Sequence, residues 1–361
     1  MRRSYKFAFL IRITMERNKI KVGITQGDIN GTSYEIMLKT FQEQRFNEIC
    51  TPVIYGSPKI AAYYRKALNI NNFSFNSVSS ADEAADHKAN LVNVLDDNAK
   101  VELGKCTTMS GEASVASLEA AANDFAAGKL SALVLNPINT SLTADLNVAD
   151  QFDFVKRKLQ VDNTVTMLVN NTLRVALLSG VSPMRDISKH LSIDNIVAKL
   201  RIINDALKTD FAIDKPKIAV LGFNPNCMGA ATLEREEKDI IVPAIERANS
   251  ENVLAMGPYN ADLVFGTDLF RQFDAVLAIY YEQGMVPFRT LSYDDGVSYL
   301  IGMQNLCVAP FQSIGYEDAG LDKAQPNALQ SAIYLACDVL ANRAQYKQLT
   351  SNPLKKHNIS D

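Results

Sequence analysis

The sequence is short of histidine and has no clustered cysteines. Its three histidines stand far apart in the chain, at His87, His190 and His357. The five cysteines are odd in number and contain no C-x-x-C pair; they are Cys50, Cys106, Cys227, Cys307 and Cys337. This pattern argues against a disulfide framework and against a cysteine zinc site, and it predicts free thiols in a reducing cytoplasm.

The chain also lacks long hydrophobic runs and a surplus of basic residues. With 37 basic and 40 acidic residues the net charge is -3, so we expect no nucleic-acid partner. The apolar stretch 7–11 is too short for a signal-peptide core, and nothing elsewhere is long enough to cross a membrane. Met15 stands just ahead of the first expected strand, so residues 1–14 are interpreted as an upstream extension.

The sequence does contain a regular alternation of two kinds of segment. Short apolar runs typical of buried strands alternate with segments of helical period at 111–129, 193–207, 234–248 and 326–343. This alternation predicts an α/β fold with parallel sheets and helices on both faces. Two further runs, 165–169 and 173–178, predict a hairpin around Asn170 and Asn171. At 361 residues the chain suits two domains, closely docked because no long linker divides it.

Polar residues follow several of the expected strands at the point where each strand ends. They form the segments 136–140 and 224–227 and, after the apolar run 273–280, a predicted sharp turn at Gln283 and Gly284. Open α/β sheets place ligands just past the carboxyl ends of their strands. The strand ends therefore predict the rim of one shared cleft, although core strands followed by solvated turns would give the same pattern.

Several segments together resemble one family. In chain order they are 27–35, 136–139, 173–177, 222–225, 236–237 with 243–245, and 280–287. From about residue 19 to residue 354 they resemble the 4-hydroxythreonine-4-phosphate dehydrogenase (PdxA) family of vitamin B6 biosynthesis. The resemblance implies two α/β/α domains like those of isocitrate and isopropylmalate dehydrogenases, and a homodimer whose cleft is shared by both subunits. It also implies oxidation of a secondary alcohol by NAD and loss of carbon dioxide, with a divalent metal polarising the reacting oxygen.

The resemblance implies three histidine ligands for that metal, and none of them is present. The corresponding positions hold Gln151, Val181 and Tyr281. Valine has no lone pair to donate, and the neutral amide of glutamine is a poor substitute for imidazole. We therefore expect the family's divalent metal site to be lost.

The substrate positions implied by the resemblance are changed as well. The family's phosphate-binding lysine corresponds to Arg289, its asparagine to Ser298 and its phosphate-binding arginine to Cys307. Loss of that arginine would remove charge-assisted bonds worth about 1.5–3 kcal/mol. The segment 311–315 departs from the family's Asp-His-Gly-Thr-Ala, which speaks against the NAD that the resemblance implies. The other candidates for the rim of the cleft are Asp28, Asn139, Asn224, Asn226, Glu282 and Gln283.

Three functions remain open on this basis. An ordinary dehydrogenase of the family would need the missing metal ligands. A homologue without metal-dependent oxidative decarboxylation would bind a small phosphorylated or carboxylated ligand, or another protein. An oxidoreductase of altered chemistry, acting on 4-hydroxythreonine 4-phosphate or a related phosphorylated hydroxy acid, would hold a hard metal through Asp150, Asp153 and Glu282, which stand at or beside the lost histidine positions.

The predicted domain limits follow from the resemblance and the strand–helix pattern. Residues 15–140 with 300–361 form the first domain, which contains both chain ends. Residues 141–299 form the second domain, which provides dimer contacts and part of the cleft.

Overall fold

The computed structural model describes residues 20–351 with the exception of 97, 226, 228–232 and 293. The extension predicted for residues 1–14 and the rim candidate Asn226 therefore lie outside the described part of the chain.

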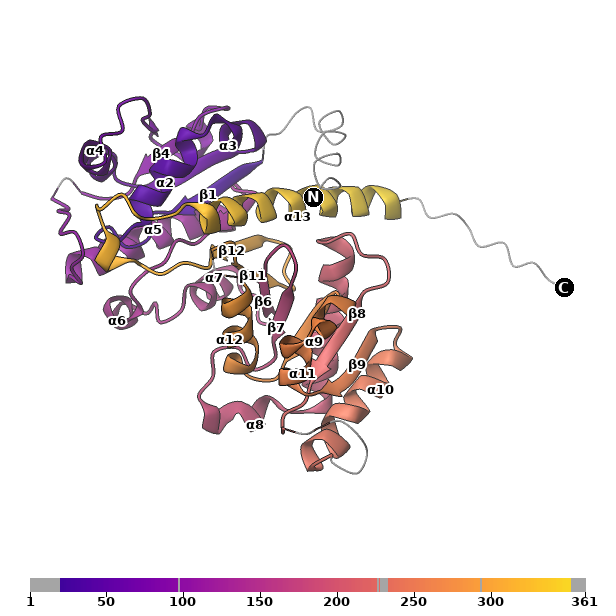
Figure 1. Cartoon of the computed structure of the whole chain (residues 1–361). Coiled ribbons are helices and arrows are strands. Elements are labelled where there is room, and N and C mark those ends of the chain that lie inside the picture. The colour runs from indigo at the N-terminus through magenta and orange to yellow at the C-terminus, as the bar shows by residue number, and fades with distance from the viewer. Residues whose placement is uncertain (1–19, 97, 226, 228–232, 293, 352–361) are drawn as a thin grey trace.

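A single twelve-stranded sheet runs through the described part of the molecule (Figure 1). Its order is β3-β4-β2-β1-β5-β12-β11-β6-β7-β10-β8-β9, so the two halves of the chain share one sheet. The strands are β1 (Lys21–Thr25), β2 (Thr51–Gly56), β3 (Asn76–Val78), β4 (Asn90–Asn93), β5 (Ala132–Val134), β6 (Val165–Val169), β7 (Arg174–Leu177), β8 (Lys217–Leu221), β9 (Leu254–Tyr259), β10 (Ala275–Ala278), β11 (Val297–Ile301) and β12 (Leu306–Pro310).

Helices connect these strands, and the predicted mixed α/β fold is confirmed. They are α2 (Ser33–Gln42), α3 (Gln44–Ile49), α4 (Pro58–Ala67), α5 (Thr108–Ala126), α6 (Thr140–Thr143), α7 (Gln151–Leu159), α8 (Ile187–His190), α9 (Ile193–Thr209), α10 (Val242–Ser250), α11 (Ala261–Gly266), α12 (Tyr281–Leu291) and α13 (Asn327–Thr350). Five short 3₁₀ turns are η1 (Ala81–Glu83), η2 (Ala144–Leu146), η3 (Met184–Asp186), η5 (Asp268–Gln272) and η6 (Tyr316–Asp318), and η4 (Glu237–Ile241) is a π-helix.

The centre of the sheet is antiparallel, so the parallel pairing expected from the strand–helix alternation does not hold there. β11 pairs antiparallel with β12 and with β6, and β6 pairs antiparallel with β7. The β6–β7 pair is the predicted hairpin. The turn between them is stabilised by Oδ1 of Asn170, which accepts hydrogen bonds from the backbone N–H groups of Thr172 and Leu173. Only antiparallel strands can be joined by so tight a turn.

This reversal sets the direction of the strands in the two halves. β7, β10, β8 and β9 are mutually parallel and run opposite to β12, β5, β1 and β2. The carboxyl ends of the two groups of strands therefore lie at opposite ends of the sheet where the halves meet.

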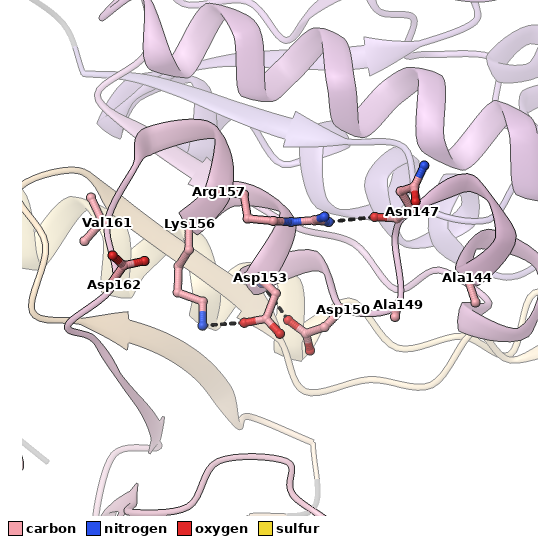
Figure 2. Close-up of a pocket in the computed structure, with 9 residues that line it drawn as sticks. All are labelled: Ala144, Asn147, Ala149, Asp150, Asp153, Lys156, Arg157, Val161 and Asp162. Atoms are coloured by element: carbon pink, nitrogen blue, oxygen red, sulfur yellow. Dashed lines mark hydrogen bonds and ion pairs between the residues drawn. The ribbon is translucent and has the colours of Figure 1, made fainter. Parts of the chain in front are cut away.

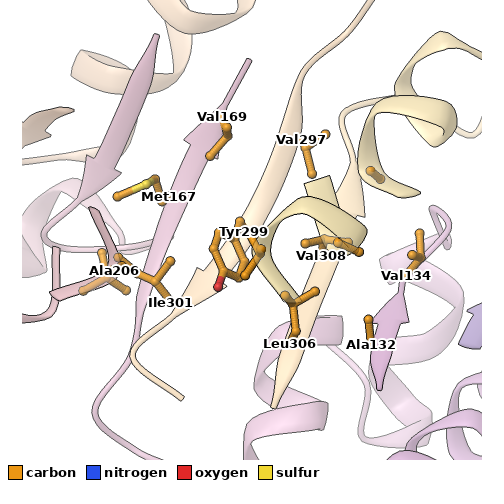
Figure 3. Close-up of a cluster of buried hydrophobic side chains, with 14 of the residues drawn as sticks. Ala132, Val134, Met167, Val169, Ala206, Val297, Tyr299, Ile301, Leu306 and Val308 are labelled. Atoms are coloured by element: carbon orange, nitrogen blue, oxygen red, sulfur yellow. The ribbon is translucent and has the colours of Figure 1, made fainter. Parts of the chain in front are cut away.

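Successive side chains along each strand point to opposite faces of the sheet and pack into different hydrophobic clusters. One cluster is continuous across both halves and includes Val134 of β5, Met167 of β6 and Tyr299 of β11 (Figure 3). The other face carries two separate clusters, one around Leu133 and one around Val175. The two-domain division remains a prediction, and its limit between residues 299 and 300 falls inside β11.

The sharp turn predicted at Gln283 and Gly284 is wrong, because both residues lie inside α12. Gly284 is buried, and a Cβ atom there would come within 2.8 Å of side-chain atoms of Leu177 and Val175. The glycine therefore allows α12 to pack closely on β7. Pro287 lies within the same helix.

A buried ion pair joins α13, in the first predicted domain, to Asp210 at the end of α9, in the second. Arg343 contacts both carboxylate oxygens of Asp210, at 2.6 and 3.1 Å, and donates to the hydroxyl of Tyr299 at 2.8 Å. The Asp210 side chain is 1% exposed, and its Oδ2 atom also accepts a 2.6 Å hydrogen bond from Tyr299. No helix in the described part of the chain is long and apolar enough to span a membrane.

Candidate functional site

Asp28 is fully buried just after β1, where its own turn and two distant segments provide its hydrogen-bond donors. Its Oδ1 accepts a 2.8 Å hydrogen bond from the backbone of Asn30, and its Oδ2 accepts from the hydroxyls of Tyr316, at 2.7 Å, and Ser110, at 3.2 Å. Burial, together with the hydrogen bond to Asp28, raises the pKa of the Tyr316 phenol. Tyr316 is therefore a neutral donor that satisfies a buried carboxylate.

Asn139 extends this cluster toward the surface. Its side chain caps α6, and its Nδ2 donates to the Tyr316 hydroxyl and to Sγ of Cys106, both at 3.1 Å. Cys106 is exposed, so the cluster links a buried carboxylate to a thiol in contact with solvent.

Three side chains organise the ends of β8 and β10. Glu237, which is fully buried in the π-helix, accepts hydrogen bonds from the backbone N–H groups of Phe223 and Asn224, at 2.9 and 2.8 Å. The Asn224 amide donates back to Glu237 at 3.0 Å. Gln283 accepts from the backbone of Ile279 and donates to the carbonyl of Gly222, both at 2.8 Å, so it joins the two strand ends. Asn224 and Gln283 therefore stabilise the backbone at the ends of β8 and β10.

Arg289 lies on the last turn of α12 and is exposed. Its guanidinium carbon sits 4.5 Å from the ring centroid of Phe311, which directly follows β12. In the described part of the chain Arg289 forms no ion pair and no hydrogen bond. It is therefore a cation stacked on an aromatic ring, with its N–H groups free for an anion.

The other two substrate positions differ from Arg289. Ser298 is half-buried in β11, opposite Ala309 of β12. Cys307 is 0% exposed inside β12, and burial raises the pKa of its thiol. Cys307 is therefore part of the core and presents no group to a ligand.

The three positions of the implied metal ligands do not form a donor set. Val181 is 80% exposed and carries no donor atom. Tyr281 begins α12, and burial raises the pKa of its phenol, so it is neutral near neutral pH. Gln151 begins α7, and its Oε1 is buried without a hydrogen-bond partner. One orphaned amide oxygen, one neutral phenol and one valine do not fit a divalent metal.

A cavity of about 490 Å³ lies beside the first turns of α7 (Figure 2). Its lining includes Asp150, Asp153, Lys156 and Asp162. Oδ1 of Asp150 caps the helix by accepting from the backbone N–H of Asp153, and the Asp153 carboxylate pairs with Lys156. Glu282 is not part of this lining. Among the residues that the structure describes, no three His, Cys, Asp or Glu side chains lie close enough together to hold a metal ion.

The candidates for the rim of the cleft follow two groups of strands. Asp28 and Asn139 follow β1 and β5, whereas Asn224, Glu282 and Gln283 follow β8 and β10. These two groups of strands run in opposite directions, and the single rim expected for all of these residues remains a prediction.

Sequence reasoning missed the contacts of three residues of these clusters. Tyr316 begins the short turn η6, and Phe311 and Cys106 lie in loops, so only the folded chain shows their partners. Glu237 stood within a recognised segment, but its buried position in a π-helix carries no sequence signal.

The fold is shared with crystallised dehydrogenases. The 4-hydroxythreonine-4-phosphate dehydrogenase from Klebsiella pneumoniae superposes with a TM-score of 0.74 at 20% identity, covering 91% of this chain and 99% of that chain. The enzyme of the same name from Burkholderia phymatum gives a TM-score of 0.71 at 20% identity, covering 90% and 99%. Similarity at this identity establishes the fold.

The family follows from the sequence comparisons. The family model described as pyridoxal phosphate biosynthetic protein PdxA matches residues 48–336. The 4-hydroxythreonine-4-phosphate dehydrogenase of Bacteroides thetaiotaomicron is 39% identical over 346 residues, which cover 95% of this chain and 94% of that protein. The chain belongs to the PdxA family, and the resemblance read from its motifs is confirmed.

Proposed function

We propose that this chain is a PdxA-family protein that binds a small phosphorylated or carboxylated ligand without carrying out the family's metal-dependent oxidative decarboxylation. The observation that carries the proposal is the state of the three ligand positions. Val181 is exposed and has no donor atom, Tyr281 is a neutral phenol, and Gln151 offers a single amide oxygen. Without a metal, charge developing on a substrate oxygen would lose several kcal/mol of stabilisation.

Ligand binding is supported by Arg289. The resemblance places a phosphate-binding lysine at this position, and arginine keeps the charge while adding a planar fork of N–H donors. Its lack of an ion pair or hydrogen bond in the described part of the chain leaves that fork free. Since Cys307 is buried, Arg289 is the cation on which we expect the anion to depend.

We also propose that the protein is a homodimer. The resemblance implies a cleft shared by both subunits, and the rim candidates of one chain fall into two groups that follow strands of opposite direction. Exposed apolar side chains near the end of β7, namely Val181 and Met184, at 80% and 68% exposure, provide a surface that such a partner would cover.

An active oxidoreductase with an altered metal site is the second candidate. It is favoured by the 39% identity to a protein named 4-hydroxythreonine-4-phosphate dehydrogenase. Of the three carboxylates expected to hold its metal, Asp150 and Asp153 line one cavity and Glu282 does not. Asp153 is already paired with Lys156, which leaves fewer free oxygens than a hard divalent metal prefers.

An activity assay with a metal analysis separates the two candidates. The purified protein is mixed with NAD and 4-hydroxythreonine 4-phosphate, with added zinc, manganese or magnesium, and NADH formation is followed. We expect no NADH and no tightly bound metal. Turnover of about 1 per second, an ordinary enzyme rate, would overturn the proposal in favour of the oxidoreductase.

The matched variant restores the implied ligands by combining Gln151→His, Val181→His and Tyr281→His. We expect it to bind zinc, as measured by elemental analysis after dialysis. If the unmodified protein retains as much zinc as this variant, the metal is held elsewhere and the interpretation of these three positions is wrong.

A further inference from the structure

Phe311 is fixed in place from two sides. Its backbone N–H donates a 2.8 Å hydrogen bond to the carbonyl of Gly296, and its ring meets the buried ring of Phe288 edge-on, with centroids 5.6 Å apart and planes at 85°. A Cβ atom at residue 296 would lie 3.1 Å from Cβ of Phe311 and 3.0 Å from the ring of Phe288. Only a residue without a side chain lets both rings sit as they do.

The guanidinium of Arg289 lies over that ring. The guanidinium carbon is 4.5 Å from the ring centroid, a distance typical of a cation–π contact. A similar contact exists between Arg174 and Phe211, at 4.4 Å, but there the guanidinium also donates to the carbonyl of Asp274. Arg289 differs from Arg174 because no protein acceptor in the described part of the chain engages its N–H groups.

We propose that Phe311 is a positioning residue for anion binding, holding the Arg289 guanidinium flat so that its N–H edge faces the phosphate or carboxylate of the ligand. This inference rests on the proposed ligand-binding function. A long exposed side chain loses conformational freedom when it binds, and a side chain already held in place loses less. A planar guanidinium stacked on a ring keeps its in-plane donors free for a bidentate contact with an anion.

Phe311 links the end of β12 to the helix that carries Arg289. It follows directly after β12, in the first predicted domain, whereas Arg289 comes from α12, in the second, so the contact joins the two predicted domains. The ring is held by Phe288, which lies one residue before Arg289 in the same helix. Anion binding at Arg289 is therefore coupled to the packing of α12 against the end of β12.

The test measures binding of inorganic phosphate and of pyrophosphate to the full chain by isothermal titration calorimetry. Phe311→Leu and Phe311→Met remove the ring in two different ways, and Phe311→Tyr keeps it. Arg289→Gln removes the cation. Phe73→Leu, at a partly buried phenylalanine that packs against Phe75, is the control for general loosening of the fold. Circular dichroism melting checks each variant for folding.

We expect Arg289→Gln to abolish saturable binding, and the two ringless variants to weaken it about fivefold, in line with a modest cation–π contribution. Phe311→Tyr and Phe73→Leu should bind as the unmodified protein does.

The outcomes separate this inference from the proposed function. If Arg289→Gln loses binding but both ringless variants bind at full strength, the positioning role is wrong and ligand binding at Arg289 stands. If Arg289→Gln binds as well as the unmodified protein, the proposed site itself is wrong. Absence of saturable binding to the unmodified protein overturns both.

Discussion

The hydroxyl of Tyr316 donates a 2.7 Å hydrogen bond to Oδ2 of Asp28, although 288 positions separate the two residues in the chain. Asp28 is 0% exposed, so its side-chain oxygens depend on protein donors for their hydrogen bonds. The contact joins the end of the first strand to a loop near the C-terminal helix, and it brings together elements from the two ends of the sequence.

Replacing Tyr316 with phenylalanine should destabilise the protein. The change leaves Oδ2 of Asp28 with only the longer contact to Ser110, at 3.2 Å. A buried acceptor that loses its donor costs about 1–3 kcal/mol, so we expect the free energy of unfolding in urea to fall by that amount. Tyr346→Phe, at an exposed tyrosine of α13, is the control and should change little. Equal stabilities for the two variants would contradict the role given to Tyr316.

Replacing Arg343 with methionine should have a larger effect. The change keeps an apolar stem but leaves Asp210, which is 1% exposed, without its cation. Breaking a buried pair in this way costs about 3 kcal/mol. Chemical denaturation measures the loss, with Arg235→Met as the control. Arg235 pairs with Asp239 at a position where both side chains are exposed, and such pairs contribute about 0–1 kcal/mol. If Arg343→Met lowers the free energy of unfolding no more than the control does, the contacts of Asp210 do not stabilise the packing of the two predicted domains.

Gly284→Ala should disturb the packing of α12. The added methyl group would come within 2.8 Å of Leu177 and Val175, and we expect a loss of about 1–3 kcal/mol in the free energy of unfolding. Gly266→Ala is the matched control, since Gly266 ends α11 and a Cβ atom there has no neighbour within 4 Å. Thermal melts of both variants provide the measurement. If Gly284→Ala leaves the free energy of unfolding unchanged, α12 lies further from β7 than the structure places it.

Thiol labelling should distinguish Cys106 from Cys307. Alkylation requires a thiolate that the reagent can reach, and Cys106 is exposed whereas Cys307 is 0% exposed. Burial raises the pKa of Cys307, so its thiol stays protonated and raising the pH from about 7 to about 9 should not make it react in the folded protein. Iodoacetamide treatment followed by peptide mass spectrometry should find Cys106 modified first and Cys307 only after denaturation. Early modification of Cys307 would contradict its place in the core.

Periodicity predicted the elements of the fold better than their directions. The helix α9 and the hairpin β6–β7 follow from apolar spacing alone. The antiparallel placement of β11 between β12 and β6 depends on contacts between residues far apart in the sequence. Gly284 was interpreted as a turn because glycine is common in turns, but here the absence of a side chain serves helix packing.

The candidate site was predictable only where charge or a missing donor marked it. Arg289 has the same charge as the lysine that the resemblance places at this position. Val181 has no lone pair for a metal in any surroundings. The stacking of Arg289 on Phe311 could not be predicted, because it depends on the distance between the end of β12 and the last turn of α12. The burial of Cys307 likewise depends on which face of β12 it occupies.

The position of β12 in the sheet has a consequence for how the chain is made. β5 (Ala132–Val134) pairs with β1 on one side and with β12 (Leu306–Pro310) on the other. While residues 135–305 are being synthesised, the second edge of β5 has no partner, and unpaired strand edges invite pairing with other chains. A ribosome-bound first half therefore cannot complete its own sheet, and the nascent chain is most exposed to aggregation until β12 has emerged.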